Sequence, residues 1–342
     1  MSFLRRLANQ PRSSHRRQSG FSLIELMVGL TIGLIVVAAL LILFANASAT
    51  GQNLGRSSEQ IENGRYISEL LREDIRLAGM YGEMPDSPVA PVYTNPDPCL
   101  LVPTGFVNSP LGLPAPIQGF KPADVVDCLP NRKAGTSALA VRRLSVDTTP
   151  IASLVANQHY VQYSFCSTDP TATLLVFDKL SASFTLKNFA CTATNPAREY
   201  VSRIYYIADC NVCGTDTTPT LKRVELLAGA LVTTPLAEGI EQLRFEYGFD
   251  TDGNGSTDTY LVDSVSPGAG GPTSLWQNVM TVRAHFIVRS LSKITGAPST
   301  TAANAFALGN VTNVDDPGDG YARRVYSTTI RLVNPSGSRE TP

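Results

Sequence analysis

The sequence predicts an α+β protein in which a long N-terminal helix, transmembrane in its first half, packs on an antiparallel β-sheet head with long disulfide-stapled loops. Three observations predict this fold class. An apolar run of 20 residues, 26–45, contains one polar side chain, Thr31. A second stretch repeats apolar residues at helical spacing, and several later segments alternate with period two. Six cysteines lie beyond the apolar run, two of them in a stretch that is rich in glycine and proline.

The apolar run is about 30 Å long as a helix, which is enough to cross the hydrocarbon core of a membrane. Five arginines and no acidic residue precede Glu25. The positive-inside rule therefore predicts a cytoplasmic N-terminus, one span within residues 21–45 and export of the chain that follows. The alternative is an ordinary secretory signal cut near Ala47 or Ala49, but the run is longer than the usual apolar core of such a signal.

Glu25 stands at the head of the apolar run. An unpaired carboxylate in hydrocarbon costs at least about 2.5 kcal/mol, so this side chain is expected to have a partner. Cleavage after Gly20 would create an α-amino group on Phe21, four residues before Glu25. Positions i and i+4 are neighbours on a helix, so the amine of the same chain or of an adjacent chain can pair with Glu25.

Residues 20–27 read GFSLIELM and follow a basic leader. This motif resembles the prepilin signal of the type IV pilin and pseudopilin family. The resemblance implies that a prepilin peptidase cuts between Gly20 and Phe21, that Phe21 is N-methylated, and that Glu25 guides assembly by pairing with a neighbour's N-terminus. The chain then has three parts: a cleaved cytoplasmic leader over 1–20, a long helix over 21–80 and an exported β-rich head over 81–342.

The helix is expected to continue beyond the membrane to about residue 78, where Gly79 ends it. The apolar residues of its second half fall on one face and are expected to pack on the sheet. They are Ile67, Leu70, Leu71, Ile75 and Ala78.

Residues 82–136 are rich in proline and glycine and predict an irregular loop region. Nine later segments are predicted as strands from their composition and alternation. They are 137–144, 159–166, 173–177, 183–186, 200–208, 221–228, 241–249, 279–289 and 324–333. In 279–289 the polar residues Thr281, Arg283 and His285 share one face, which predicts an antiparallel sheet with one packed and one solvated face.

An even number of cysteines in an oxidising compartment predicts disulfides, although fifteen full pairings are possible. We expect each cysteine to pair with its neighbour in the sequence: Cys99 with Cys128, Cys166 with Cys191, and Cys210 with Cys213. The last pair has the C-x-x-C spacing of zinc and redox sites. A zinc site needs two more ligands, and a redox motif needs a strand–helix context that the following loop does not provide.

A loop from residue 250 to 258 has oxygen side chains at positions 1, 3, 5 and 9 and a glycine, Gly255, at position 6. This is the first part of an EF-hand-like calcium loop, in which hard oxygens converge on one cation. The candidate ligands are Asp250, Asp252, Asn254, Ser256 and Asp258. Leu261 stands where a bidentate glutamate belongs, with Asp263 as a substitute, and a plain hairpin turn explains the same composition.

Removal of the leader changes the formal net charge from −1 to −6, because it takes away five arginines. Such a balance gives no electrostatic support for nucleic-acid binding. Only His159 and His285 remain after cleavage, and both lie in predicted strands. No motif of nucleophilic or metal-dependent catalysis is found, so we expect no enzymatic activity. Trp276 is interpreted as a packing residue.

Three C-terminal segments, 204–207 with 221–223, then 238–247, then 324–332, resemble PilW-type minor pilins and their relatives, the J-type pseudopilins of type II secretion. The resemblance implies a low-abundance subunit in the inner membrane with a periplasmic head, which primes type IV pilus assembly and then lies at the cell surface, at the pilus tip. Its partners would be the prepilin peptidase, other minor pilins and the major pilin. The alternatives are a J-type pseudopilin or a membrane-anchored, calcium-dependent adhesin.

Overall fold

The computed structural model describes residues 20–84, 90–108, 110–170, 173–262, 276–294 and 300–340. Its first element is helix α1 (Leu23–Arg76), so the predicted helix over 21–78 is confirmed to within two residues at each end. The chain divides into two compact units, 1–54 and 55–342, and α1 contributes to both. The predicted leader, apart from Gly20, lies outside the described residues.

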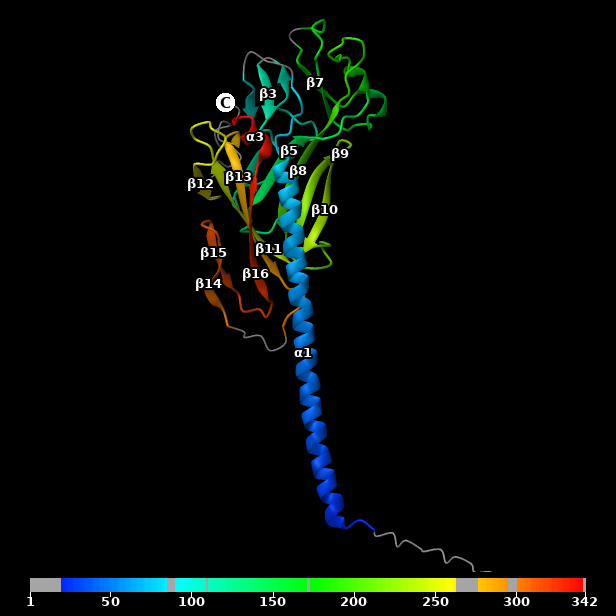
Figure 1. Cartoon of the computed structure of the whole chain (residues 1–342), viewed down its shortest axis with the longest axis vertical. Coiled ribbons are helices and arrows are strands. Elements are labelled where there is room, and N and C mark those ends of the chain that lie inside the picture. The colour runs from blue at the N-terminus through cyan, green and yellow to red at the C-terminus, as the bar shows by residue number, and fades with distance from the viewer. Residues whose placement is uncertain are drawn as a thin grey trace, which may run out of the picture. The chain divides into compact units, whose positions relative to one another are not determined.

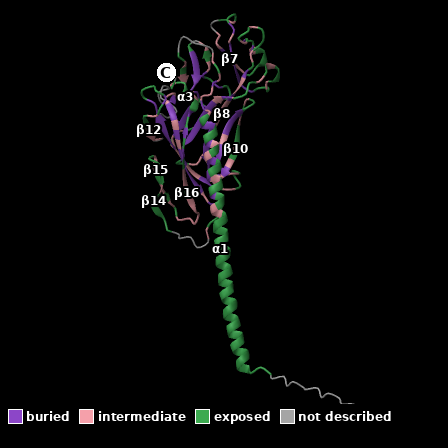
Figure 2. Ribbon diagram, in the orientation of Figure 1, coloured by how far each residue is buried: buried purple, intermediate pink, exposed green. Residues whose placement is uncertain are grey.

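In the first unit, every described residue of α1 is exposed (Figure 2). In the second unit, the same helix buries one face, on which Ile67, Leu71 and Ile75 are fully buried. This change along one continuous helix follows the sequence, because apolar residues surround the axis in 26–45 but return at helical spacing only after residue 66. Gly79, with a φ of 74°, lies in the turn that follows α1 and permits its sharp change of direction.

A seven-stranded sheet occupies the middle of the chain (Figure 1). Its main path runs β10-β9-β8-β5-β4, and β6 and β7 extend it from β8. The strand pairs in this sheet are antiparallel, as predicted. Its strands are β4 (Ile117–Phe120), β5 (Ala138–Leu144), β6 (Tyr160–Tyr163), β7 (Leu175–Asp178), β8 (Arg198–Ala208), β9 (Thr220–Leu227) and β10 (Ala230–Glu238).

A second, antiparallel sheet of four strands has the order β12-β11-β13-β16. Its strands are β11 (Ile240–Phe249), β12 (Thr259–Val262), β13 (Val279–Arg289) and β16 (Arg323–Arg331). A hairpin of β14 (Ala302–Leu308) and β15 (Thr312–Asp316) lies between β13 and β16 in the sequence, and α3 (Val333–Gly337) follows β16. The buried face of α1 shares one apolar core with both sheets, including Leu139 and Ile207 from the first and Phe245 and Phe286 from the second.

A glycine in α1 lets the helix approach β16 closely. A Cβ atom on Gly64 would lie 2.3 Å from Cζ of Tyr326, so only glycine leaves room for this ring. The Tyr326 hydroxyl donates to the carbonyl of Gln60 one turn earlier, over 3.1 Å. The Gln60 side chain in turn donates to the carbonyl of Ala322, over 2.7 Å. Sequence periodicity did not reveal these polar contacts, because their acceptors are backbone atoms more than 200 residues away.

A buried carboxylate joins α1 to the first sheet. Asp74 is 4% exposed, and its Oδ1 lies 3.2 Å from Nε of Arg143 and 3.0 Å from Nη1 of Arg203. Its Oδ2 accepts a hydrogen bond from the Tyr205 hydroxyl over 2.8 Å. Burial and the negative charge of Asp74 raise the pKa of Tyr205, so the tyrosine stays protonated and donates. Glu225 pairs with the other side of Arg203, so the network continues across β5, β8 and β9.

Two strand expectations are wrong. Residues 82–136 are not irregular throughout: beside β4 they contain β1 (Val92–Thr94), β2 (Val107–Asn108) and β3 (Leu111–Pro114), and β1 pairs with β3 in parallel. These strands are short, and every residue of β3 and β4 is buried. The sequence did not predict them because the region contains so many prolines. Residues 183–186 do not form a strand, because the backbone N–H of Leu186 bonds to the side chain of Gln162 instead of a neighbouring strand.

The other predicted strand segments each contain a strand of the structure, with ends that differ by a few residues. Strands β10, β12, β14 and β15 were not predicted. β10 follows β9 through a two-residue turn, Ala228-Gly229, in which both residues have positive φ. Such turns favour hairpins, but alanine at the first position gave no local signal for one.

All six cysteines form disulfides, in the pairing that the sequence led us to expect: Cys99–Cys128, Cys166–Cys191 and Cys210–Cys213. The first two close long segments without regular helices, and the third closes a short turn between β8 and β9. These loops therefore depend on covalent closure as well as on packing.

We predict that a disulfide stabilises the head more when it closes a longer loop, with a logarithmic dependence on loop length. The sequence separations are 29 for Cys99–Cys128 and 3 for Cys210–Cys213. From loop-closure entropy, replacing both cysteines by alanine should cost about 3.6 kcal/mol for the first pair and about 1.6 kcal/mol for the second. Urea unfolding of the full chain in detergent, followed by the fluorescence of its one tryptophan, measures both. Equal losses for the two pairs would contradict this explanation.

A second prediction concerns Asp74. Replacement by asparagine would leave the guanidinium groups of Arg143 and Arg203 without their shared carboxylate, and these side chains are only 13% and 22% exposed. We expect a loss near the lower end of the roughly 3–5 kcal/mol that breaking a buried ion pair costs. The control is Glu69→Gln, whose ion pair with Arg72 is exposed and should contribute less than about 1 kcal/mol. Equal effects of the two substitutions in urea unfolding would refute the role of Asp74.

Candidate functional site

The first candidate site is the N-terminal end of α1. The carbonyl of Ser22 accepts the first helical hydrogen bond from the N–H of Leu26, over 3.1 Å. The N–H of Ser22 donates to Oε2 of Glu25, over 3.2 Å. This is half of a capping box, in which a glutamate in the first turn reaches back to the residue that starts the helix. Glu25 thus folds back over the end of its own helix.

This geometry bears on the predicted cleavage. If the chain is cut after Gly20, the new amine on Phe21 is only one residue from the N–H that Glu25 already binds. The carboxylate therefore lies where positive charge would appear, at a helix N-terminus that itself favours a negative group. The same carboxylate is exposed and can also be reached by the amine of a second chain.

The second feature of this segment is its apolar surface. Between Phe21 and Phe44 the large apolar side chains are 50–86% exposed. The first part of α1 is long and apolar enough to cross a membrane. An apolar surface of this size is unfavourable in water, so it requires lipid or other apolar helices to cover it. Gly29 and Gly33, spaced as in G-x-x-x-G, give the helix a small face for close packing.

The predicted calcium loop lies between β11 and β12, which pair as an antiparallel hairpin. One carboxylate oxygen each from Asp250, Asp252 and Asp258 come within 4.8 Å of one another. Each of these side chains already accepts hydrogen bonds inside the loop. Asp258 binds Thr251, Asp252 binds Asn254, and the Asn254 side chain accepts the N–H of Ser256. Asp263, proposed as a further ligand, lies outside the described residues.

Asp250 is the buried member of the loop, with a side chain that is fully covered. It accepts the N–H groups of Gly253 and Gly255, and Nη1 of Arg339 lies 2.8 Å from its Oδ2. Burial alone would raise the pKa of Asp250, but the hydrogen bonds from Arg339 and from the two glycines outweigh it and lower the pKa to about 2. A guanidinium thus neutralises the residue that would be the first calcium ligand, which favours the plain turn over a cation site. Arg339 could not be foreseen, because it lies 89 residues further along the chain.

His285 is buried, and the expectation that it is solvated is wrong. It is 5% exposed, with Nδ1 2.7 Å from Oγ of Ser327 and Nε2 3.5 Å from Oε1 of Glu246. The turn of the β14–β15 hairpin covers this part of the sheet: the N–H of Asn310 donates to Glu246 over 2.7 Å. Alternation correctly predicted the polar face of β13, but not the hairpin that lies over it.

The remaining candidates have structural roles. Trp276 is fully buried and packs edge-on against Tyr247, as predicted, with ring centroids 5.0 Å apart. Cys210 and Cys213 are bonded to each other, so they do not offer thiolates to zinc. Among the described residues, the aspartates of the 250–258 loop are the only group whose ligand atoms gather closely enough to suggest a metal.

Two parts of the chain match known families. Residues 15–41 match the prokaryotic N-terminal methylation motif, and residues 204–334 match the family described as type IV pilus-assembly protein W. No curated protein matches the chain. A solved structure, a type IV-like pilin from Thermus thermophilus, is 12% identical and aligns with 59% of this chain and 80% of its own, with a TM-score of 0.27.

A methylation motif that overlaps the start of α1, and an exposed apolar helix that continues into an α+β head, are features that the chain shares with the type IV pilin class. Within this class the chain is similar to the minor pilins of the PilW type. The PilW match begins within β8 and covers the strands from β9 to β16, so it includes the whole second sheet and also β9 and β10 of the first. Proteins of this class are structural subunits.

The turn interpretation makes a prediction. Because Arg339 and backbone N–H groups already satisfy Asp250, we expect the melting temperature of the head to be the same in millimolar calcium chloride and in a chelator. Arg339→Gln should lower the melting temperature in both solutions, since it leaves Asp250 buried without its cation. A calcium-dependent rise in melting temperature that Asp252→Ala abolishes would support the calcium hypothesis instead.

Proposed function

We propose that this chain is a minor pilin that is inserted in the inner membrane through residues 21–45, is cut between Gly20 and Phe21 by a prepilin peptidase and is N-methylated on Phe21. It then joins other minor pilins in a complex that primes assembly of a type IV pilus. The observation that carries the proposal is the match to the methylation motif on a helix whose apolar surface is exposed from Phe21 to Phe44.

The proposed mechanism is an exchange of the surroundings of α1. In the membrane, lipid covers the apolar surface. The N-terminus of the chain faces the cytoplasm, and the residues after the span lie in the periplasm. In the fibre, apolar helices of neighbouring subunits replace lipid. Glu25 stays close to the helix N-terminus in both states, and the amine of a neighbouring chain would neutralise it on assembly.

We place the subunit at the tip of the pilus. Its head includes sheets of seven, four and three strands, a hairpin and three disulfide-closed loops, and all 288 residues of the unit 55–342 would have to recur in every repeat of the shaft. One or a few copies at an end avoid that constraint. Immunogold labelling distributed along the shaft would contradict this position.

The alternative function is that of a J-type pseudopilin of type II secretion, which would be inserted in the membrane and cleaved in the same way. The match over residues 204–334 is to a pilus-assembly family, which favours the pilus. A membrane-anchored adhesin would need a head that binds its target without other pilins. Deletion of the gene, with pilus formation and protein secretion scored in the same strain, separates the first two settings.

The proposal predicts the N-terminus of the mature protein. Extracted from cells with an active prepilin peptidase, the chain should begin at Phe21 with one added methyl group; without the peptidase it should keep its leader. Glu25→Gln should be cleaved normally but should reduce incorporation into pili, because it removes the charge and leaves the side-chain shape. Glu62→Gln, a change of the same kind at an exposed position of α1 in the second unit, is the control. A mature chain that starts near Ala47 or Ala49 would show an ordinary secreted protein.

A further inference from the structure

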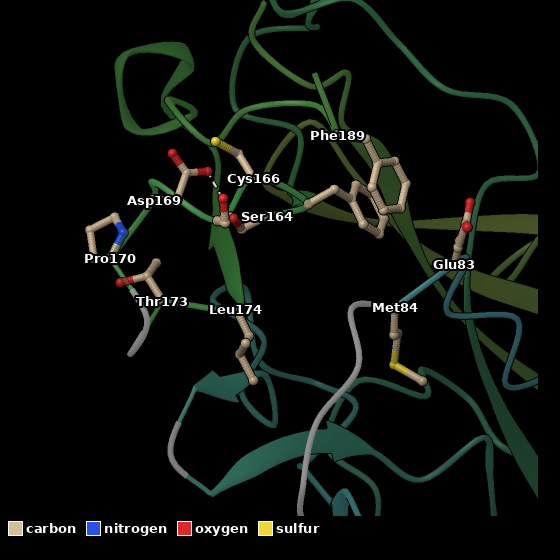
Figure 3. A pocket seen from close by; sticks show the side chains of 11 residues that line it. Glu83, Met84, Ser164, Cys166, Asp169, Pro170, Thr173, Leu174 and Phe189 are labelled. Atoms are coloured by element: carbon tan, nitrogen blue, oxygen red, sulfur yellow. Dashed lines mark hydrogen bonds between the residues drawn. The ribbon is translucent and has the colours of Figure 1, made fainter. Parts of the chain in front are cut away.

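A pocket of about 630 Å³ lies in the second unit, between the segment after α1 and the loops around β6 and β7 (Figure 3). Its size is within the range of small-molecule sites. The lining combines four apolar side chains of substantial size with two carboxylates: Met84, Phe165, Leu174 and Phe189, and Glu83 and Asp169. The eleven described residues that line it include no lysine, arginine or histidine.

A disulfide builds the aromatic side of the pocket. Phe165 precedes Cys166 in the loop that follows β6, and Phe189 lies two residues before Cys191. The Cys166–Cys191 bond brings these segments together, and the two rings stack with centroids 4.6 Å apart and planes 21° apart. Phe189 is nevertheless 71% exposed. A large aromatic ring held by a covalent bond at the edge of a pocket, and left mostly uncovered, is suited to contact with a ligand.

The acidic groups lie on opposite sides of the pocket. In Figure 3, Asp169 and Glu83 stand at its two ends, with Phe189, Leu174 and Met84 between them. Asp169 is held in place by the Ser164 hydroxyl, over 2.8 Å, and by the backbone N–H of Lys187, over 2.9 Å. These hydrogen bonds are the main cause of its lowered pKa, so it is ionised at neutral pH; the charge of the Lys187 ammonium contributes least.

A cation on the Glu83 side, Arg198, belongs to a neighbouring pocket. Arg198 lines that second pocket, which shares Glu83 and Phe165 with the first. Its Nη1 donates to the carbonyls of Ser145 and Val146, and Arg198 is not among the described residues that line the first pocket. The first pocket thus has negative charge at both ends, an apolar middle and an aromatic ring.

We propose that this pocket binds an organic ammonium cation with an alkyl body, and that its two carboxylates suit an α,ω-diamine. Each ammonium group would lie against one carboxylate, and the alkyl chain would lie along Met84, Leu174 and the phenylalanine pair. The face of an aromatic ring attracts an ammonium group in addition to the carboxylates. Anions of the same size are excluded by the two negative charges. This site is independent of assembly through α1.

The test uses three probes of equal length: 1,5-diaminopentane, pentylamine and pentanol, with two, one and no ammonium groups. Each is titrated calorimetrically into the full-length protein in maltoside detergent at neutral pH. We expect affinity to fall in that order, with the diamine at least about tenfold tighter than the alcohol, a difference in reach of two ion pairs and one cation–π contact. Equal affinities for diamine and alcohol, or no binding of either amine at millimolar concentration, would overturn the proposal.

Variants locate the site. Phe189→Ala should weaken the diamine several-fold, and it should leave the melting temperature nearly unchanged because the ring is mostly exposed. Asp169→Asn should reduce the preference for diamine over monoamine while keeping an acceptor for Ser164 and Lys187. Glu62→Gln removes an exposed carboxylate outside the pocket and should change no affinity. If Glu62→Gln weakened the diamine as much as Asp169→Asn, binding would be general charge attraction and the proposed site would be wrong.

Discussion

The second unit depends on how the latter part of α1 is seated on the two sheets. Ile67, Leu71 and Ile75 fill the core, but apolar packing alone would allow the helix to slide or rotate among similar positions. Asp74 removes that freedom, because one carboxylate must meet Arg143, Arg203 and Tyr205 at once. A buried ion pair adds little net free energy of folding, but leaving one partner unpaired is strongly destabilising. The main effect of Asp74 is therefore to define a single position of the helix.

The two parts of α1 illustrate how one helix can serve two solvents. In 26–45 the apolar residues surround the axis, and the backbone satisfies its own hydrogen bonds, which is what a membrane or a helix bundle requires. After Gly55 the same backbone carries one apolar face and a polar remainder, which is what a sheet and water require. Glu25 and Asp74, near the two ends of α1, each have a specific partner in these surroundings.

Local patterns in the sequence predicted the features that arise from local physics. These include the length of α1, most strands of the two sheets and the hairpin turn at 250–258. The partners of polar side chains were not predictable, because they come from distant segments: Arg339 reaches Asp250, and the β14–β15 hairpin covers His285. The pocket between Met84 and Phe189 had no signal either, since a disulfide and three separate loops create it.

The contact between Gly64 and Tyr326 has a mechanical consequence. A force directed along α1 would shear the contacts between the helix and β16. The ring of Tyr326 occupies the space on the helix surface that is open because Gly64 has no side chain. Sliding by one residue would bring a side chain against this ring. The close fit between Gly64 and Tyr326 therefore acts as a steric barrier to movement of the helix along its axis. Under tension, the attachment of the helix to the head does not depend on the strength of any single hydrogen bond.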